Sequence, residues 1–219
     1  MMILVTGGSG SGKSAFAEDC IVSFGKARRI YIATMYPFDE ESKKRVKRHQ
    51  AMRQGKGFDT LECYTGLARA AVPEGSTVLL ECMSNLVANE MFAENKIRLR
   101  DEVTAQILDG IEALNRQLEH LLIVTNNVFE DGISYEETTA EYIEAMGQVN
   151  ERLAAMADTH FSVEKGVTDG RTFTHVRRLN RAQRRQELAR LTGGSHVSQT
   201  MLDGAEELLA QAEAFRAEL

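Results

Sequence analysis

Cysteine and proline are scarce in this chain and tryptophan is absent: its 219 residues include three cysteines and two prolines. Cys20, Cys63 and Cys82 are odd in number and widely spaced, so they form no paired motif for zinc binding, redox chemistry or a disulfide framework. We expect these three residues to be reduced thiols and assign them no chemistry.

Long hydrophobic runs are also missing. No apolar stretch approaches the roughly 20 residues that cross a bilayer, and the N-terminus shows neither a basic segment nor a small-residue cleavage site. We therefore expect a soluble, cytoplasmic protein. Repeats and low-complexity segments are absent as well, and the length suits one α/β core with an extension rather than two full-sized enzymatic domains.

The composition also lacks an excess of positive charge. The formal net charge is −6, which argues against a general nucleic-acid-binding protein. Two local basic stretches, 43–48 and 177–185, interrupt this acidic average. Such stretches usually form solvated helix faces, and this interpretation is preferred for the second of them.

The chain does contain a complete phosphate-binding loop. The run GGSGSGKS follows an apolar stretch, 2–6, and leads into a helical stretch, 15–22. Glycines let backbone N–H groups crowd around a phosphate at the start of a helix. With a strand before it and a helix after it, a glycine-rich turn that binds nothing is the weaker interpretation. The sequence predicts a nucleoside triphosphate site at Gly7, Gly8, Ser9, Gly10, Ser11, Gly12, Lys13 and Ser14.

Three side chains have predicted tasks at this site. Lys13 would reach the β- and γ-phosphate oxygens, and the Ser14 hydroxyl would bind Mg²⁺. Glu81 ends an apolar strand roughly 70 residues after the loop, where P-loop enzymes place the acidic partner of the magnesium ion. The alternative for Glu81 is a carboxylate that caps the next helix. The metal role is favoured because the loop is present.

Strand-like and helix-like segments alternate along the chain. They predict an α/β fold, with a mostly parallel, P-loop NTPase-like sheet, helices on both faces, and a C-terminal strand and helical extension. The second strand, 29–34, would deliver Thr34 and Met35 to the ligand-binding edge of the sheet. Further strands are expected at 59–63, 77–81, 121–125, 159–164 and 171–178, and helices at 40–54, 83–94, 100–118 and 136–157.

The tail is expected to turn at 166–170 and to form a last strand of alternating character. Two helices, split by Gly193 and Gly194, would follow. Ser198 would cap the second of them. That helix carries an apolar stripe, most simply used for core or oligomer packing, which consists of Leu202, Leu208, Leu209, Ala212 and Phe215.

His49 lies in the charged helix 40–54, with Arg45 and Arg53 about one helical turn away on the same face. The two arginines suit a triphosphate. A neutral imidazole nitrogen there could attack an α-phosphate, expel pyrophosphate and leave a reactive nucleotidyl-histidine. On spacing alone, a solvated surface histidine is the better interpretation.

Several segments together resemble a known family. In chain order they are MILVTGGSGSGKSAFAE, RIYIAT, the RVKRH helix, LEC, VLLEC with Asn85 and Asn89 after it, VTNNV and GQVNERLAAMAD. This order is similar to that of the adenosylcobinamide kinase/adenosylcobinamide-phosphate guanylyltransferases, the CobU/CobP family of cobalamin biosynthesis. The resemblance covers residues 1–165, a whole domain by size. It leaves 166–219 as an extension of unknown role.

The resemblance implies a bifunctional transferase, usually trimeric, that phosphorylates adenosylcobinamide and then transfers GMP from GTP through a GMP-histidine intermediate. His49 would be the nucleophile, which reverses the preference for a surface histidine. GTP, ATP, Mg²⁺ and the corrinoid would bind, and no nucleic acid is expected. Carried over by motif, the nucleotide contacts would be residues 7–14, Ala33, Thr34, Met35, Gln50, Ala51, Met52, Arg53, Glu62 and Glu81.

The chain departs from the family pattern at several positions. Where relatives commonly read Thr-Asn-Glu-Val-Gly, Asn127 and Phe129 occupy the third and fifth positions, and 132–135 lacks the usual proline. Where they read Arg-x-Phe-Arg-Asp, Ala140 and Ile143 replace the two arginines. We expect these differences to bear on the corrinoid side or on subunit contacts more than on nucleotide binding.

The tail, 157–216, resembles the C-terminal end of the DNA-repair ATPase RecN, although the chain has neither a long heptad coiled coil nor an ABC-type signature. Two alternatives to the bifunctional enzyme therefore stay open. One is a nucleotide-dependent ATPase or interaction module whose arginine-rich tail docks a partner or DNA. The other is a kinase for a different hydroxylated small molecule, without nucleotidyl transfer.

Overall fold

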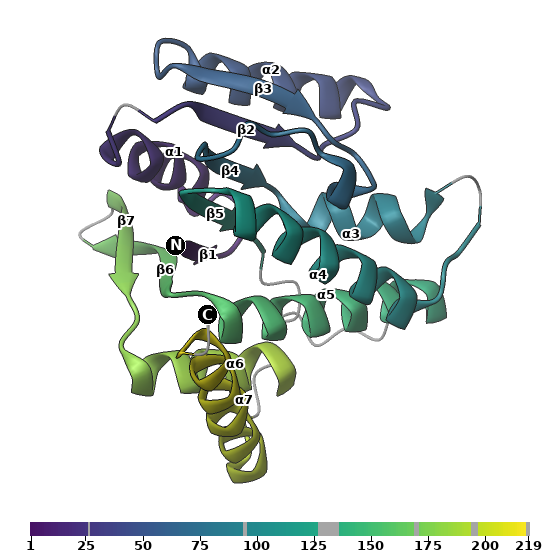
Figure 1. Ribbon diagram of the computed structural model, residues 1–219, viewed down its shortest axis with the longest axis vertical. Helices are drawn as coiled ribbons and strands as arrows, with labels where there is room; N and C mark the ends of the chain where they lie inside the picture. The colour runs from purple at the N-terminus through teal and green to yellow at the C-terminus, as the bar shows by residue number, and fades with distance from the viewer. Residues whose placement is uncertain (26, 94–95, 127–135, 169–170, 194–196, 218–219) are drawn as a thin grey trace.

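The computed structural model describes residues 1–25, 27–93, 96–126, 136–168, 171–193 and 197–217. These residues form a seven-stranded sheet in the order β3-β2-β4-β5-β1-β6-β7 (Figure 1). Neighbouring strands are parallel except for β6 and β7. The predicted mostly parallel α/β fold is confirmed. The strands are β1 (Met2–Thr6), β2 (Arg29–Ala33), β3 (Phe58–Glu62), β4 (Thr77–Glu81), β5 (His120–Val124), β6 (Thr159–Thr168) and β7 (Arg171–Arg178).

Helices cover both faces of this sheet, as predicted (Figure 1). In chain order they are α1 (Lys13–Ser23), α2 (Glu40–Arg53), the 3-10 helix η1 (Leu67–Arg69), α3 (Met83–Met91), α4 (Arg100–Gln117), α5 (Glu137–Met156), α6 (Arg181–Gly193) and α7 (Gln199–Ala217). The helix α1 packs on one face, whereas α3, α4 and α5 pack on the other. In the described ranges no helix is long and apolar enough to cross a membrane.

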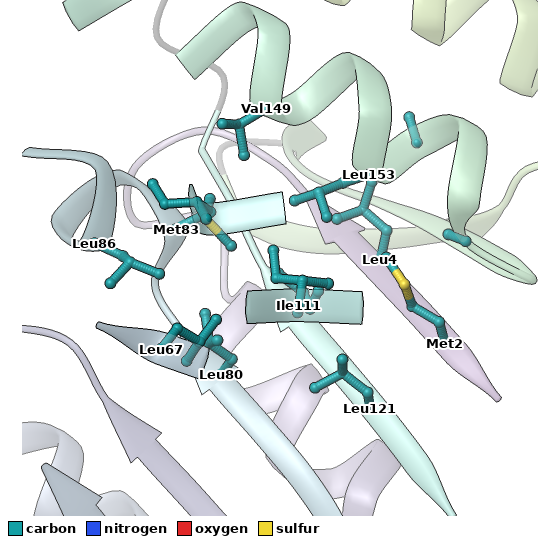
Figure 2. Close-up of a cluster of buried hydrophobic side chains, with 14 of the residues drawn as sticks. Met2, Leu4, Leu67, Leu80, Met83, Leu86, Ile111, Leu121, Val149 and Leu153 are labelled. Atoms are coloured by element: carbon teal, nitrogen blue, oxygen red, sulfur yellow. The ribbon is translucent and has the colours of Figure 1, made fainter. Parts of the chain in front are cut away.

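Two apolar layers, one on each face, hold the sheet between the helices. The larger layer lies under α3, α4 and α5 and includes Leu80, Ile111 and Leu153, all fully buried (Figure 2). The smaller layer lies under α1 and includes Ile21 and Val124. Because successive side chains of a strand point to opposite faces, β1, β4 and β5 supply both layers. This double coverage explains why these strands are largely apolar in the sequence.

The C-terminal hairpin differs from the prediction in length and in burial. The sequence predicts a strand that ends at 164, whereas β6 continues to Thr168 in antiparallel pairing with β7. The predicted turn therefore starts later than 166, and residues 169–170 lie outside the described ranges. The alternating character predicted for β7 does not appear in its burial, because all eight residues are exposed. The strand β7 is the sheet edge and lies beyond the covering helices (Figure 1).

The tail helices α6 and α7 pack into the larger apolar layer of the sheet. Leu188 of α6 is fully buried in the larger layer, and the Ser198 hydroxyl accepts a hydrogen bond from the Met201 N–H at 3.3 Å, which confirms the predicted cap. The boundary expected at 165 lies inside β6. The side chain of Phe215 lies outside the described part. The other members of the predicted stripe contact the larger layer, namely Leu202, Leu208, Leu209 and Ala212.

The arginines of the tail bind the protein itself. Arg184 donates hydrogen bonds to the carbonyl oxygens of Ala154 and Ala157, at the end of α5, over 3.0 and 2.6 Å. Arg181 pairs with Glu206 of α7 at 2.8 Å. Further ion pairs join Arg181 to Glu213, Arg185 to Asp203 and Arg177 to Glu164. These contacts hold the tail on the core, so this basic stretch gives little support to a DNA-docking surface.

A buried polar cluster ties α6 to the strand that precedes the phosphate-binding loop. The Thr6 hydroxyl lies 3.0 Å from His160 Nε2 and donates to Glu187 Oε1 at 3.4 Å. Burial lowers the pKa of His160 to about 4. Although burial opposes it, the hydrogen bond from Arg190 lowers the pKa of Glu187. The cluster thus joins β1, β6 and α6 through a neutral imidazole and a charged carboxylate.

Acid is expected to destabilise the protein through His160. Its pKa of 6.5 in the unfolded chain falls to about 4 in the folded protein, so the unfolded chain binds the proton first. The free energy of unfolding therefore falls as the pH drops from 6.5 to 4, by roughly 3 kcal/mol in total. Urea unfolding over this pH range measures the effect. His160→Gln should flatten the profile and the exposed His175→Gln should not; equal profiles for the parent and His160→Gln would contradict the assignment.

Candidate functional site

The carboxyl edge of the parallel strands opens into a cleft of about 940 Å³. One wall is the phosphate-binding loop with the start of α1, and another wall is α2. The strand ends supply Ala33, Glu62 and Glu81. From α2 the lining residues are Glu41, Lys44, Arg45, Val46, Arg48, His49, Gln50, Met52 and Arg53. The volume suits a nucleotide-sized ligand, and most charged groups on the α2 wall are cationic.

The phosphate-binding loop depends on its glycines. Gly10 and Gly12 have φ angles of 68° and 95°, which residues with a Cβ rarely adopt. A Cβ on Gly7 would lie 2.2 Å from the Val163 carbonyl oxygen of β6, and one on Gly12 would lie 3.0 Å from Thr174 Oγ1 of β7. The loop is therefore fitted closely against the C-terminal hairpin. Residues 9–14 line the cleft, whereas the predicted contacts at 7 and 8 do not.

Lys13 is buried at the base of the loop. It is 7% exposed, and its Nζ donates a hydrogen bond to the Gly8 carbonyl oxygen at 2.9 Å. Burial lowers its pKa, and the nearby Cys82 and Glu81 only partly oppose that shift. Keeping this ammonium group charged in a buried position costs free energy, and an anionic ligand bound beside it would offset that cost. The neighbouring cationic side chains of α2 favour an anion as well.

Glu81 lies at the end of β4 beside the start of α1, as predicted. The Ser14 hydroxyl donates to Glu81 Oε1, and the Tyr31 hydroxyl donates to Oε2 at 3.2 Å. Burial and the Glu81 charge raise the pKa of Tyr31. The capping alternative for Glu81 is not supported, because α3 begins after Cys82 without a side-chain cap. A hydroxyl and a carboxylate oxygen that meet in this way are ligands that suit Mg²⁺.

A metal ion at this position would need further ligands from a bound nucleotide. Among the residues that the structure describes, no group of three or more His, Cys, Asp or Glu could hold a metal ion. Mg²⁺ is usually bound through one or two protein oxygens together with phosphate oxygens and water. Ser14 and Glu81 therefore fit the predicted ion in the presence of a nucleoside triphosphate.

His49 projects from α2 into the same corner. Its Nδ1 lies 3.7 Å from Glu81 Oε1, and its side chain is 17% exposed. This Nδ1 atom is buried and has no hydrogen-bond partner. Arg45 and Arg53 line the cleft on the same side of α2, as predicted. A solvated surface histidine does not fit this burial, and His49 lines the cleft.

Arg53 forms the inner part of the α2 wall. Its guanidinium carbon lies 3.4 Å from the centroid of the Tyr31 ring, which positions it by a cation–π contact. The residue is 7% exposed, and its Nη1 has no hydrogen-bond partner. A buried donor without an acceptor at the cleft wall favours an oxygen from a ligand. Arg45, by contrast, forms an ion pair with the exposed Glu41.

Two of the remaining predicted contacts do not line the cleft. Thr34 is fully buried, and its hydroxyl bonds both the Cys82 carbonyl oxygen and the Cys82 N–H, at 2.8 and 2.7 Å. It therefore joins the ends of β2 and β4. Ala51 is exposed and lines a second, shallow hollow formed by the end of α2, the loop that follows it and β3. The predicted contacts that do line the cleft are Ala33, Met35, Gln50, Met52 and Glu62.

The sequence predictions omit several lining residues. Tyr31, Lys44, Asn85, Asn126 and Lys165 all line the cleft. Asn126 directly follows the predicted strand 121–125, and residues at this position of a parallel strand lie at the ligand-binding edge. Its contact with the cleft could therefore have been predicted from the sequence. Tyr31 lies within β2 and Lys165 lies one position beyond the predicted strand, and neither carries a local signal of ligand contact.

Two asparagines of the family-like segments stabilise this edge instead of facing the ligand. Asn89 Nδ2 donates to the carbonyl oxygens of Thr34 and Tyr64, at 2.8 and 3.0 Å. Asn150 of α5 is fully buried, and its Nδ2 donates to the Asn126 carbonyl oxygen at 3.1 Å. Both residues hold the backbone of loops that follow strand ends, and these loops border the cleft.

The family model for cobinamide kinase / cobinamide phosphate guanyltransferase, CobU, matches residues 3–169. The chain belongs to this family. A CobU relative, the bifunctional adenosylcobalamin biosynthesis protein of Salmonella typhimurium, is 35% identical over 184 aligned residues, which cover 76% of this chain and 97% of the relative. The resemblance inferred from the motifs is therefore confirmed, and this CobU-family protein is a transferase.

Two further matches are more limited. The DNA repair protein RecN of Deinococcus radiodurans is 48% identical over 59 residues, which are 27% of this chain and 10% of that protein. This match therefore covers only a small part of that RecN protein. Among solved structures, the KaiC-like protein PH0186 from Pyrococcus horikoshii OT3 matches 82% of this chain and 79% of its own at 11% identity, with a TM-score of 0.46.

The departures from the family pattern lie away from the nucleotide side where they are described. Asn127 and Phe129 fall outside the described residues. Ala140 and Ile143 lie on α5 and do not line the cleft. Next to them, the Tyr142 hydroxyl donates to the Ser84 carbonyl oxygen at 3.3 Å, and Glu144 pairs with Arg100 of α4. The altered stretch of α5 thus contacts α3 and α4.

Proposed function

We propose that this CobU-family protein phosphorylates adenosylcobinamide with a nucleoside triphosphate and then transfers GMP from GTP to the product through His49. The position of His49 carries the proposal. Its Nδ1 lies 3.7 Å from Glu81, which in turn contacts Ser14 of the phosphate-binding loop. A nucleophile held beside a triphosphate site is what a nucleotidyl transfer needs.

In the nucleotidyl transfer, a ring nitrogen of His49 attacks the α-phosphorus of GTP. A P–N bond forms, and the P–O bond to pyrophosphate breaks. A phosphate oxygen of the acceptor then attacks the same phosphorus, the P–N bond breaks and the imidazole is restored. The Glu81 carboxylate, 3.7 Å from Nδ1, would stabilise the positive charge that the ring gains as it attacks. Lys13 and Arg53 supply donors to the developing charge.

In the phosphorylation, the acceptor hydroxyl oxygen attacks the γ-phosphorus and the nucleoside diphosphate leaves. The protein contributes positioning and electrostatic stabilisation, for which Lys13 and the N–H groups of the loop are placed. When bound, Mg²⁺ held by Ser14 and Glu81 would neutralise charge on the phosphate oxygens. The family resemblance further leads us to propose a homo-oligomer, with a trimer as the expected form, which sedimentation would measure.

Incubation of the purified protein with Mg²⁺ and GTP labelled at the α-phosphate, without acceptor, tests the proposal. We expect label to remain on the denatured chain in an acid-labile, base-stable form, as a phosphorus–nitrogen bond requires. Absence of label with intact GTP binding would exclude the nucleotidyl transfer. It would leave a kinase of a hydroxylated small molecule or a nucleotide-dependent interaction module. Phosphorylation of adenosylcobinamide in a separate assay would then identify a cobinamide kinase without nucleotidyl transfer, and no phosphorylation would leave the kinase of a different small molecule or the interaction module.

A further inference from the structure

A second lysine reaches the phosphate-binding loop from the C-terminal hairpin. Lys165 of β6 lines the cleft together with residues 9–14. A Cβ placed on Gly10 would lie 3.7 Å from Lys165 Nζ, which puts the ammonium next to the bend of the loop. Lys13 lies at the base of the same loop, bonded to Gly8. Ammonium groups from two different elements therefore flank the place where phosphates are expected.

The ammonium group of Lys165 is exposed to the cleft. In the part of the chain that the structure describes, no hydrogen bond or ion pair joins its ammonium to another residue. The neighbouring Glu164 faces the other side of the hairpin, because successive side chains of a strand alternate. There it pairs with Arg177 at 2.8 Å. The positive charge at the loop thus remains for a ligand.

The hairpin that carries Lys165 is bonded to the loop through its other strand, β7. Lys165 is opposite Thr174 in the antiparallel register of β6 and β7. The Thr174 hydroxyl donates a hydrogen bond to the Ser11 carbonyl oxygen at 3.2 Å. The strand β6 also pairs directly with β1, which leads into the loop. The ammonium is therefore carried on backbone that is fixed relative to the loop, which reduces the ordering needed when a ligand binds.

We propose that Lys165 is a second phosphate-binding residue of this cleft and contacts the β- or γ-phosphate of the bound nucleoside triphosphate. The proposal deepens the proposed function and rests on its nucleotide site. His49, which would receive the nucleotidyl group, lies beside Glu81 and Ser14, whereas Lys165 lies beside Gly10. A contact near Gly10 therefore acts on the outer phosphates and contributes little to the binding of a monophosphate. A solvated lysine on an exposed hairpin, the alternative, would contribute to neither.

Binding of two nucleotides to Lys165→Met tests this contact. The probes are GMP and a GTP analogue with a methylene group between the α- and β-phosphates, which cannot be cleaved there. Titration calorimetry at one fixed ionic strength should show about tenfold weaker binding of the analogue, as expected for one charge-assisted contact. Binding of GMP should change by less than about twofold. Lys165→Arg, which keeps the charge, should restore most of the affinity for the analogue.

Arg171→Met is the matched control. Arg171 lies on the exposed β7 and, by alternation, faces the side of the hairpin away from Lys165. The substitution removes one positive charge, as Lys165→Met does, and should leave the affinities for the GTP analogue and for GMP unchanged. Equal losses for the analogue and GMP, or no loss in Lys165→Met, would overturn the inference alone. If the parent protein binds neither nucleotide, the proposed function fails together with the inference.

Discussion

Replacing His49 with alanine is expected to abolish covalent labelling by α-labelled GTP while most of the kinase activity remains. Without the imidazole, no atom forms the P–N bond, so we expect guanylyl transfer to fall by at least about a thousandfold. The kinase step uses the hydroxyl of the acceptor as nucleophile, and Lys13, Ser14 and Glu81 remain in place. Transfer of label from the α-position of GTP and from the γ-position of ATP or GTP measures the two reactions separately.

Two further variants show whether His49 acts as a nucleophile or as a structural residue. His49→Asn keeps a polar side chain beside Glu81, yet it should be as inactive in guanylyl transfer as the alanine variant. His175→Ala removes an exposed imidazole on β7 and should leave both activities unchanged. An equal loss of both activities in His49→Ala, together with weaker nucleotide binding, would show that the histidine holds α2 in place.

The phosphate-binding loop and the parallel core could be predicted because their signals are local. The positive φ angles at Gly10 and Gly12 require glycine, and Lys13 follows them directly. The strands β1, β4 and β5 are largely apolar because both of their faces are covered, which is visible in the sequence as short apolar runs. Glu81 could be placed for the same reason, since it ends one of these runs.

The rest of the site depends on which strands become neighbours in the sheet. A local sequence pattern does not reveal that pairing. Lys165 reaches the loop only because β6 pairs with β1, and Tyr31 reaches Glu81 because β2 pairs with β4. The same pairing explains why Thr34 does not line the cleft. Its position after a strand predicts contact with the ligand, but its hydroxyl is used to join two strand ends. The alternation predicted for β7 does not appear as alternating burial for a related reason. Its sequence does not show that the strand lies at the edge of the sheet, where both faces are exposed.

Replacing Lys13 with methionine is expected to lower both reactions by at least about a hundredfold. Removal of one positioned donor to a developing oxyanion costs about a hundred- to a thousandfold in rate, and both reactions would place a phosphate at the same loop. Methionine keeps the apolar stem of the side chain. Lys47→Met, on the exposed side of α2 and outside the cleft, should leave both rates unchanged. Loss of only one reaction would show that the two reactions use different phosphate sites.

The same Lys13 variant should lose no stability in the absence of nucleotide. Burial lowers the pKa of Lys13, so the folded protein holds this proton less tightly than the unfolded chain does. At pH 7, below the unfolded pKa of 10.5, the lysine therefore lowers the free energy of unfolding, and methionine removes that cost. Urea unfolding should give an equal or higher midpoint than the parent, while the stabilisation that GTP adds by binding should largely disappear. A lower midpoint without nucleotide would instead assign Lys13 to the fold, through its hydrogen bond to the Gly8 carbonyl oxygen.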